Sequence, residues 1–69
     1  MRILGIDPGS RITGFGIIEQ ERGRVSYVES GCVRAGDGNF SQRLKTIYDG
    51  ILEIVSLYTP DEVAIEQVF

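Results

Sequence analysis

The sequence predicts an α/β fold: a mixed β-sheet of four strands, in the order 3-2-1-4 when numbered along the chain, with one crossover helix. Three observations predict it. Three strand-like segments follow one another with short turns between them, a long amphipathic segment comes next, and a short apolar segment follows it within the 69 residues. Short turns join antiparallel strands, whereas a helix between two strands brings the chain back parallel. We expect residues 1–69 to belong to a single domain.

The first predicted strand, residues 2–7, carries apolar side chains on both faces, which indicates a central position in the sheet. Its last residue is an acid, Asp7, and a tight turn through Pro8 and Gly9 follows. An acid at the end of an apolar strand conflicts with the local pattern. Such conflicts are where function is sought.

Two further strands are predicted at residues 12–20 and 25–33, with residues 21–24 as the hairpin loop between them. The short connections make the first three strands an antiparallel meander. In the third strand, apolar residues alternate with more polar ones, and we expect them to share one face. These residues are Val25, Tyr27 and Val33.

An amphipathic helix is predicted from Phe40 over about five turns, capped by Asn39 or Ser41 and ended before Pro60. Its apolar stripe is wide, so we expect it to pack against more than one surface. Gly50 inside this helix costs about 1 kcal/mol relative to Ala. Close approach to the sheet is the expected reason for the glycine.

Residues 62–66 form the fourth predicted strand, parallel to the first because a helix connects them. Asp7 and Glu66 then lie at the carboxyl ends of neighbouring strands, about 4.8 Å apart. Two carboxylates at that separation repel each other unless a cation or a proton is shared. None of the other eight acids falls on this edge.

Paired carboxylates without histidine favour a hard cation such as Mg²⁺, for which Mn²⁺ could substitute. Two such ions activate water and stabilise the leaving oxygen in phosphodiester cleavage. We expect Asp7 to bridge the ions and Glu66 to complete one side. Two simpler interpretations stay open: Asp7 could open the turn by bonding its own backbone, and Glu66 could be an exposed strand end.

Composition constrains the setting. The formal net charge is −3, from seven basic and ten acidic residues, which counts against a nucleic-acid-binding domain. Cys32 is the single cysteine, so no disulfide forms within the chain; we expect a small buried residue and a cytoplasmic protein. No apolar stretch is long enough to span a bilayer, so we expect no membrane partner.

Counting layers extends this picture. A sheet with two apolar faces normally needs helices on both sides, and this chain offers one. The sequence therefore looks like the front part of a longer domain. Alone, we expect it to expose an apolar sheet face and to associate with itself.

The opening hairpin also fits a second functional class. Sugar kinases, actin and the heat-shock ATPases begin with a similar Ile-Gly-Ile-Asp-x-Gly turn between two strands, where the turn cradles nucleotide phosphate. In this sequence the turn is Asp-Pro-Gly-Ser at residues 7–10. Those proteins need a far longer chain for their nucleotide cleft.

Four stretches resemble the RuvC-type Holliday junction resolvases, the crossover junction endodeoxyribonucleases. Gly-Ile-Asp-Pro-Gly-Ser-Arg-Ile-Thr-Gly-Phe-Gly opens the resemblance at residues 5–16, and Ala-Ile-Glu-Gln-Val-Phe at residues 64–69 closes it. Residues 30–34 and 43–48 match between them, in order and spacing. The ATPases and the related pre-16S rRNA nucleases share only the first stretch.

The resemblance implies a ribonuclease H-like fold and a homodimer that resolves four-way DNA junctions by paired, symmetrical nicks in recombination and repair. It also implies RuvA and RuvB as partners. Of the family's four acidic metal ligands, Asp7 and Glu66 match the first two, and the others lie on a C-terminal helix that this chain lacks. Phe69 matches an aromatic residue that presses on junction bases. With half a metal site, this piece alone is expected to be inactive.

Overall fold

A computed structural model describes residues 1–66 of the protein, so Phe69 lies outside the described residues. Every predicted element is present, and the strand ends differ from the expected ones by at most one residue. The elements in chain order are β1 (Arg2–Asp7), β2 (Ile12–Glu21), β3 (Arg24–Arg34), α1 (Phe40–Tyr58) and β4 (Glu62–Ile65).

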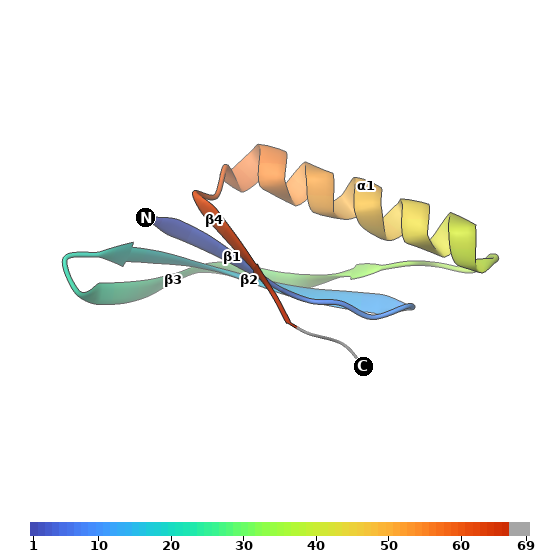
Figure 1. Cartoon of the computed structure of the whole chain (residues 1–69), viewed down its shortest axis with the longest axis horizontal. Coiled ribbons are helices and arrows are strands. Elements are labelled where there is room, and N and C mark those ends of the chain that lie inside the picture. The colour runs from blue at the N-terminus through green and yellow to red at the C-terminus, as the bar shows by residue number, and fades with distance from the viewer. Residues whose placement is uncertain (67–69) are drawn as a thin grey trace.

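The sheet has the predicted order, β3-β2-β1-β4 (Figure 1). β1 pairs antiparallel with β2 and parallel with β4, so it occupies the central position that its two apolar faces predicted. The antiparallel hairpin of β2 and β3 turns at Arg22 and Gly23, both of which have positive φ. The turn therefore needs the left-handed conformation at two successive residues.

Helix α1 lies along one side of the sheet and contacts β3 (Figure 1). The Asn39 side chain caps it, accepting a 2.9 Å hydrogen bond from the Gln42 amide, while the Gln42 side chain accepts one from the Asn39 amide. A Cβ at Gly50 would stand 2.6 Å from Cγ1 of Val33. The glycine is therefore explained by close approach to the sheet, as predicted.

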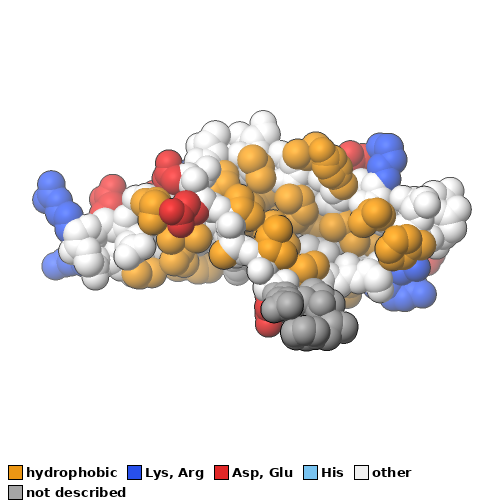
Figure 2. Space-filling view, viewed as in Figure 1, with side chains coloured by type: hydrophobic (Ala, Val, Ile, Leu, Met, Phe, Trp, Pro, Cys, Tyr) orange, Lys and Arg blue, Asp and Glu red, His pale blue; other side chains and the backbone are white. Residues whose placement is uncertain are grey.

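The core is small. In the part of the chain that the structure describes, the buried apolar residues are Leu4, Ile17 and Ala35, joined by the polar Thr13. No residue of α1 is buried, so the expected second packing surface for its wide stripe is not formed within residues 1–66. Figure 2 shows hydrophobic side chains spread across much of one face of the molecule.

Two expectations for β3 are wrong. The pairing with β2 shifts between Ile17 and Ile18, which leaves Val28 without a partner and reverses the alternation along the strand. Val33 therefore packs against α1, whereas Val25 and Tyr27 lie on the opposite face and are exposed. Cys32, expected to be buried, is exposed as well. Alternation alone cannot locate an inserted residue, because the bulge changes the face of every residue beyond it.

Within residues 1–66, α1 does not combine the length and the hydrophobicity that crossing a bilayer requires.

Candidate metal centre

Two parallel strands bring the candidate site together. β1 and β4 pair in register, with Gly5 opposite Ala64 and Ile6 opposite Ile65. The Glu66 amide continues this ladder by donating a 2.9 Å hydrogen bond to the Ile6 carbonyl oxygen. Glu66 therefore stands beside Asp7, one residue beyond the end of β4, as the crossover topology predicted.

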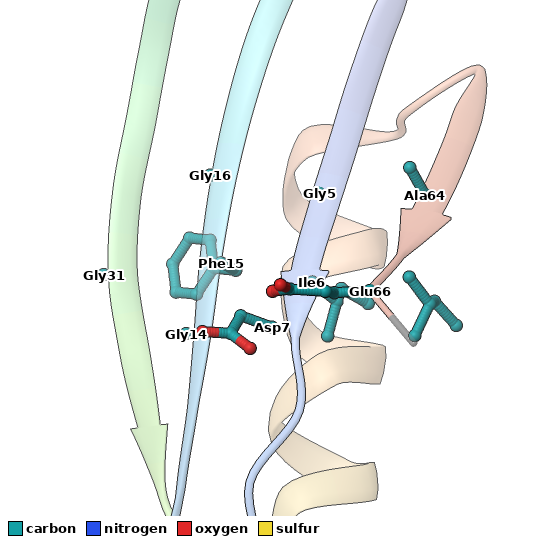
Figure 3. Close-up of a pocket in the computed structure, with 10 residues that line it drawn as sticks. Gly5, Ile6, Asp7, Gly14, Phe15, Gly16, Gly31, Ala64 and Glu66 are labelled. Carbon is teal, nitrogen blue, oxygen red and sulfur yellow. The ribbon is translucent and has the colours of Figure 1, made fainter. Parts of the chain in front are cut away.

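The two carboxyl groups meet. Figure 3 shows the Glu66 side chain reaching across β1 toward the Asp7 carboxylate. A hydrogen bond with Asp7, reinforced by the negative charge of Asp7, raises the pKa of the Glu66 carboxyl above its ordinary value. A raised pKa means that the pair favours one shared positive charge, either a proton or a cation. We call Asp7 and Glu66 the carboxylate pair.

The turn after β1 does not occupy the Asp7 carboxylate. An aspartate that opens a turn typically accepts from the amide two residues on. Here that amide, of Gly9, donates instead to Oγ1 of Thr13 at 3.3 Å. Among residues 1–66, the turn therefore leaves the Asp7 oxygens free for another partner.

The carboxylate pair borders a hollow of about 620 Å³. Ile6, Phe15 and Ile65 also line it, but the alternate positions that share the face of Asp7 and Glu66 carry little or no side chain: Gly5, Gly14, Gly16 and Ala64. A Cβ at Gly16 would meet nothing within 4 Å, and one at Gly14 would lie 3.8 Å from the Asp7 Cβ. The fold does not need these glycines to avoid a clash, so they keep the space beside the acids open.

The donor set fits part of a hard cation's shell. Carboxylate oxygens are the ligands that Mg²⁺ and similar ions prefer, usually about six in all with waters included. In the described part of the chain, however, no group of three or more His, Cys, Asp or Glu side chains gathers in one place. The carboxylate pair can supply two positions of a metal shell and needs further ligands for the rest.

Two residues that sequence reasoning missed support the turn beside Asp7. Thr13, buried at the start of β2, accepts from the Gly9 amide and donates to the Gly9 carbonyl at 3.2 Å. Arg43 reaches from α1 and donates through Nη1 to the Ser10 carbonyl oxygen at 2.9 Å. A buried threonine beginning an apolar strand was the available signal for the first. The second depends on how α1 crosses the sheet, which the sequence does not specify.

The family model of the crossover junction endodeoxyribonuclease RuvC matches residues 3–69. The chain belongs to the RuvC family. RuvC of Tolumonas auensis is 60% identical over 67 residues, and that of Aromatoleum aromaticum is 57% identical over 68. These alignments cover 97% and 99% of this chain but 39% and 37% of the relatives. The chain thus spans well under half the length of the curated relatives it matches.

Solved structures agree with the ribonuclease H-like architecture of RuvC. The structure titled "T. thermophilus RuvC in complex with Holliday junction substrate" has a TM-score of 0.84 and 28% identity, covering all of this chain and 46% of that one. An Aquifex aeolicus PPX-GPPA enzyme has a TM-score of 0.69 at 17% identity, covering 94% of this chain and 25% of that one. The second likeness concerns the fold alone. The RuvC family implies a requirement for a divalent metal.

Proposed function

We propose that residues 1–69 form the N-terminal part of a single ribonuclease H-like nuclease domain. The complete protein is then a Mg²⁺-dependent endodeoxyribonuclease, with Mn²⁺ as a substitute, that resolves four-way DNA junctions by paired symmetrical cleavage. The observation that carries this proposal is that the pairing of β1 with β4 places Asp7 and Glu66 side by side at one hollow, in a chain of the RuvC family.

Each acid has a role that follows from its position. Asp7 ends the central strand, so it can face ligands arriving from either neighbouring strand, and Glu66 closes one side. Together they would hold the cation, which would relieve their mutual repulsion. A divalent cation held there would supply activation of water and stabilisation of the leaving oxygen of a phosphodiester. The small residues on this face of the hollow leave room beside the acids for the remaining ligands.

The substrate assignment draws on the relative whose structure is titled as a complex with a Holliday junction substrate. A four-way junction presents two equivalent strands for cutting, and a twofold homodimer supplies two equivalent sites. We assign Phe69 to contact with the junction bases, RuvA and RuvB as the partners on the junction, and the cytoplasm as the location.

The test uses what we call the completed protein: residues 1–69 extended with the C-terminal segment of the Tolumonas auensis relative. We expect Asp7→Asn to abolish cleavage of a synthetic four-way DNA junction and to leave junction binding largely intact, because it removes a ligand charge without reshaping the turn. Asp49→Asn is the matched control. Asp49 is exposed on α1 and pairs with Lys45 at 2.7 Å.

Retained cleavage by Asp7→Asn would exclude Asp7 as a metal ligand. Cleavage of structured RNA in preference to junction DNA would favour the pre-16S rRNA nuclease alternative, and ATP hydrolysis would favour the actin and sugar-kinase one. The 69-residue chain alone is expected not to nick the junction, because its described residues supply two carboxylates and not a full ligand set.

A further inference from the structure

The turn formed by residues 8–11 is fastened more firmly than its size requires. From β2, Thr13 exchanges two hydrogen bonds with Gly9, at 3.3 and 3.2 Å. From α1, Arg43 donates to the Ser10 carbonyl oxygen. From the end of β3, the amide of Ala35 donates to the Arg11 carbonyl oxygen at 2.7 Å. Three separate elements therefore hold a turn of four residues.

The other hairpin of the same sheet provides an internal comparison. The turn at Arg22 and Gly23 also joins two antiparallel strands, yet no side chain in the described part of the chain bonds to its backbone. Antiparallel pairing alone is therefore enough to close a turn in this sheet. The extra fastening belongs to the turn that begins directly after Asp7.

Close packing does not hold this turn against the helix. A hollow of about 280 Å³ with an apolar lining lies between the turn and the first half of α1, bordered by Phe40, Leu44 and Ile47. Arg43 crosses beside this space, with its guanidinium carbon 5.8 Å from the Phe40 ring centroid. Its Nε is buried without a hydrogen-bond partner among residues 1–66, a costly arrangement for a polar atom. In this position the Arg43 guanidinium can donate its hydrogen bond to the Ser10 carbonyl oxygen.

We infer that Thr13 and Arg43 are positioning residues for Asp7: by fixing the turn of residues 8–11, they fix the direction of the Asp7 carboxylate toward Glu66. The inference rests on the proposed function, in which Asp7 is a metal ligand. Gly9 makes the arrangement tight, because a Cβ there would collide with the Ile12 carbonyl oxygen. Thr13 holds the amide and the carbonyl of Gly9, which is two residues after Asp7. A shift of the turn would therefore also move the Asp7 carboxylate.

The test measures Mn²⁺ binding to the completed protein by electron paramagnetic resonance, without turnover. Thr13→Val keeps the shape of the side chain and removes both hydrogen bonds, and Arg43→Gln removes the bond to Ser10. We expect each to weaken Mn²⁺ binding about tenfold, the lower end for residues that orient metal ligands. Thr13→Ser retains the hydroxyl and should restore binding. Junction affinity measured without metal should stay unchanged.

Two controls match these variants. Thr46→Val also removes a threonine bond to a main-chain oxygen, that of Gln42 at 3.1 Å, but on exposed α1. Arg24→Gln removes an exposed arginine at the far hairpin. Both should bind Mn²⁺ as the unchanged protein does. In an Asp7→Asn background, Thr13→Val should cause no further loss of Mn²⁺ affinity, because the carboxylate that Thr13 positions is already absent.

Unchanged Mn²⁺ affinity in Thr13→Val and Arg43→Gln, or an equal loss in Thr46→Val, would overturn the inference. If Thr13→Val does not fold, the inference is tested by Arg43→Gln, which should weaken Mn²⁺ binding, and by Thr13→Ser, which should retain it. Failure of the proposed function gives a different result: Asp7→Asn would then bind Mn²⁺ as well as the unchanged protein, whatever happens at Thr13.

Discussion

At the residue scale, the carboxyl group of Glu66 links the geometry of the site to a measurable titration. The hydrogen bond and charge of Asp7 raise its pKa from the ordinary value of 4.5. Between that value and the raised one, the folded state binds more protons than the unfolded state. Stability from this group is therefore fully present below pH 4.5 and is lost as the pH rises through the raised pKa.

We expect Asp7→Asn to return the Glu66 pKa toward 4.5 and to remove this pH dependence. Carbon-detected NMR of the Glu66 side chain, recorded without metal from about pH 3 to about pH 8, measures this titration directly. The range extends below and above the ordinary pKa of a glutamate carboxyl. Glu62→Gln, on β4 but away from the pair, should leave the Glu66 titration in place. An unchanged Glu66 pKa in Asp7→Asn would mean that the two carboxyls do not interact.

Sequence reasoning reached this pair because it needed only strand direction. Once β1, the helix and β4 were assigned, a right-handed crossover had one free place for β4, and both acids followed. Thr13 and Arg43 could not be found in the same way. Their bonds to Gly9 and Ser10 depend on the exact path of a turn and on the position of α1 over β3.

At the element scale, the contact between α1 and β3 depends on one missing side chain. In an exposed helix, glycine to alanine gains about 1 kcal/mol. At Gly50 we expect the opposite sign, because the new Cβ would stand 2.6 Å from Cγ1 and 3.2 Å from Cγ2 of Val33. Overpacking of this kind costs about 1–3 kcal/mol, so Gly50→Ala should destabilise the completed protein by up to about 2 kcal/mol in urea unfolding.

Shortening the neighbour tests that cause. In a Val33→Ala background the space for the methyl group is restored, and Gly50→Ala should become stabilising. Ser56→Ala, at an exposed position of the same helix, should change the free energy of unfolding by only a few tenths of a kcal/mol. A stabilising Gly50→Ala in the otherwise unchanged protein would show that α1 can move away from β3 at little cost.

The elements themselves were largely predictable, and the exceptions share a cause. Periodicity, a cap at Asn39 or Ser41 and the stop before Pro60 predicted α1, and the short turns predicted the meander. The bulge at Val28 was missed because one extra residue leaves no mark on composition, although it decides which face Val33 and Tyr27 occupy. Exposure of Cys32 was missed because its expected burial rested on residue type alone, whereas its side of β3 is not covered within residues 1–66. Local pattern predicts that an element exists, and packing decides which way it faces.

At the scale of the whole molecule, the chain is more open than a compact domain of its mass. Its accessible surface is 5117 Å², against about 4,300 Å² from the usual scaling of area with mass. Its radius of gyration is 12.9 Å, against about 11 Å for a compact chain of this length. The excess is consistent with a core of very few side chains and with an α1 that buries none of its own residues.

Exposed apolar side chains should make the isolated 69-residue chain associate with itself. β4 is an edge strand whose four residues are all exposed, and Val63 and Ile65 on it are 49% and 67% accessible. An unpaired edge with apolar side chains is a template for pairing with another chain. We therefore expect the sedimentation coefficient of the isolated chain to rise with concentration. Val63→Lys should suppress the rise, because it places a charge on the apolar side of this edge.

Glu62→Lys is the matched control, because it adds lysine to the same strand on the face opposite to Val63. It should leave self-association in place if apolar contact drives it. Equal suppression by the two lysines would instead indicate that lysine on either face of β4 blocks pairing at this edge. Net charge would not explain it, because Val63→Lys and Glu62→Lys bring the chain closer to neutrality from −3, which lowers its self-repulsion. A monomer at all concentrations would contradict the expectation, and would mean that the sheet tolerates an open edge and an open face without a partner. In the completed protein, where we propose that further chain covers these surfaces, Val63→Lys should destabilise the fold, because the lysine would then be placed in an apolar contact.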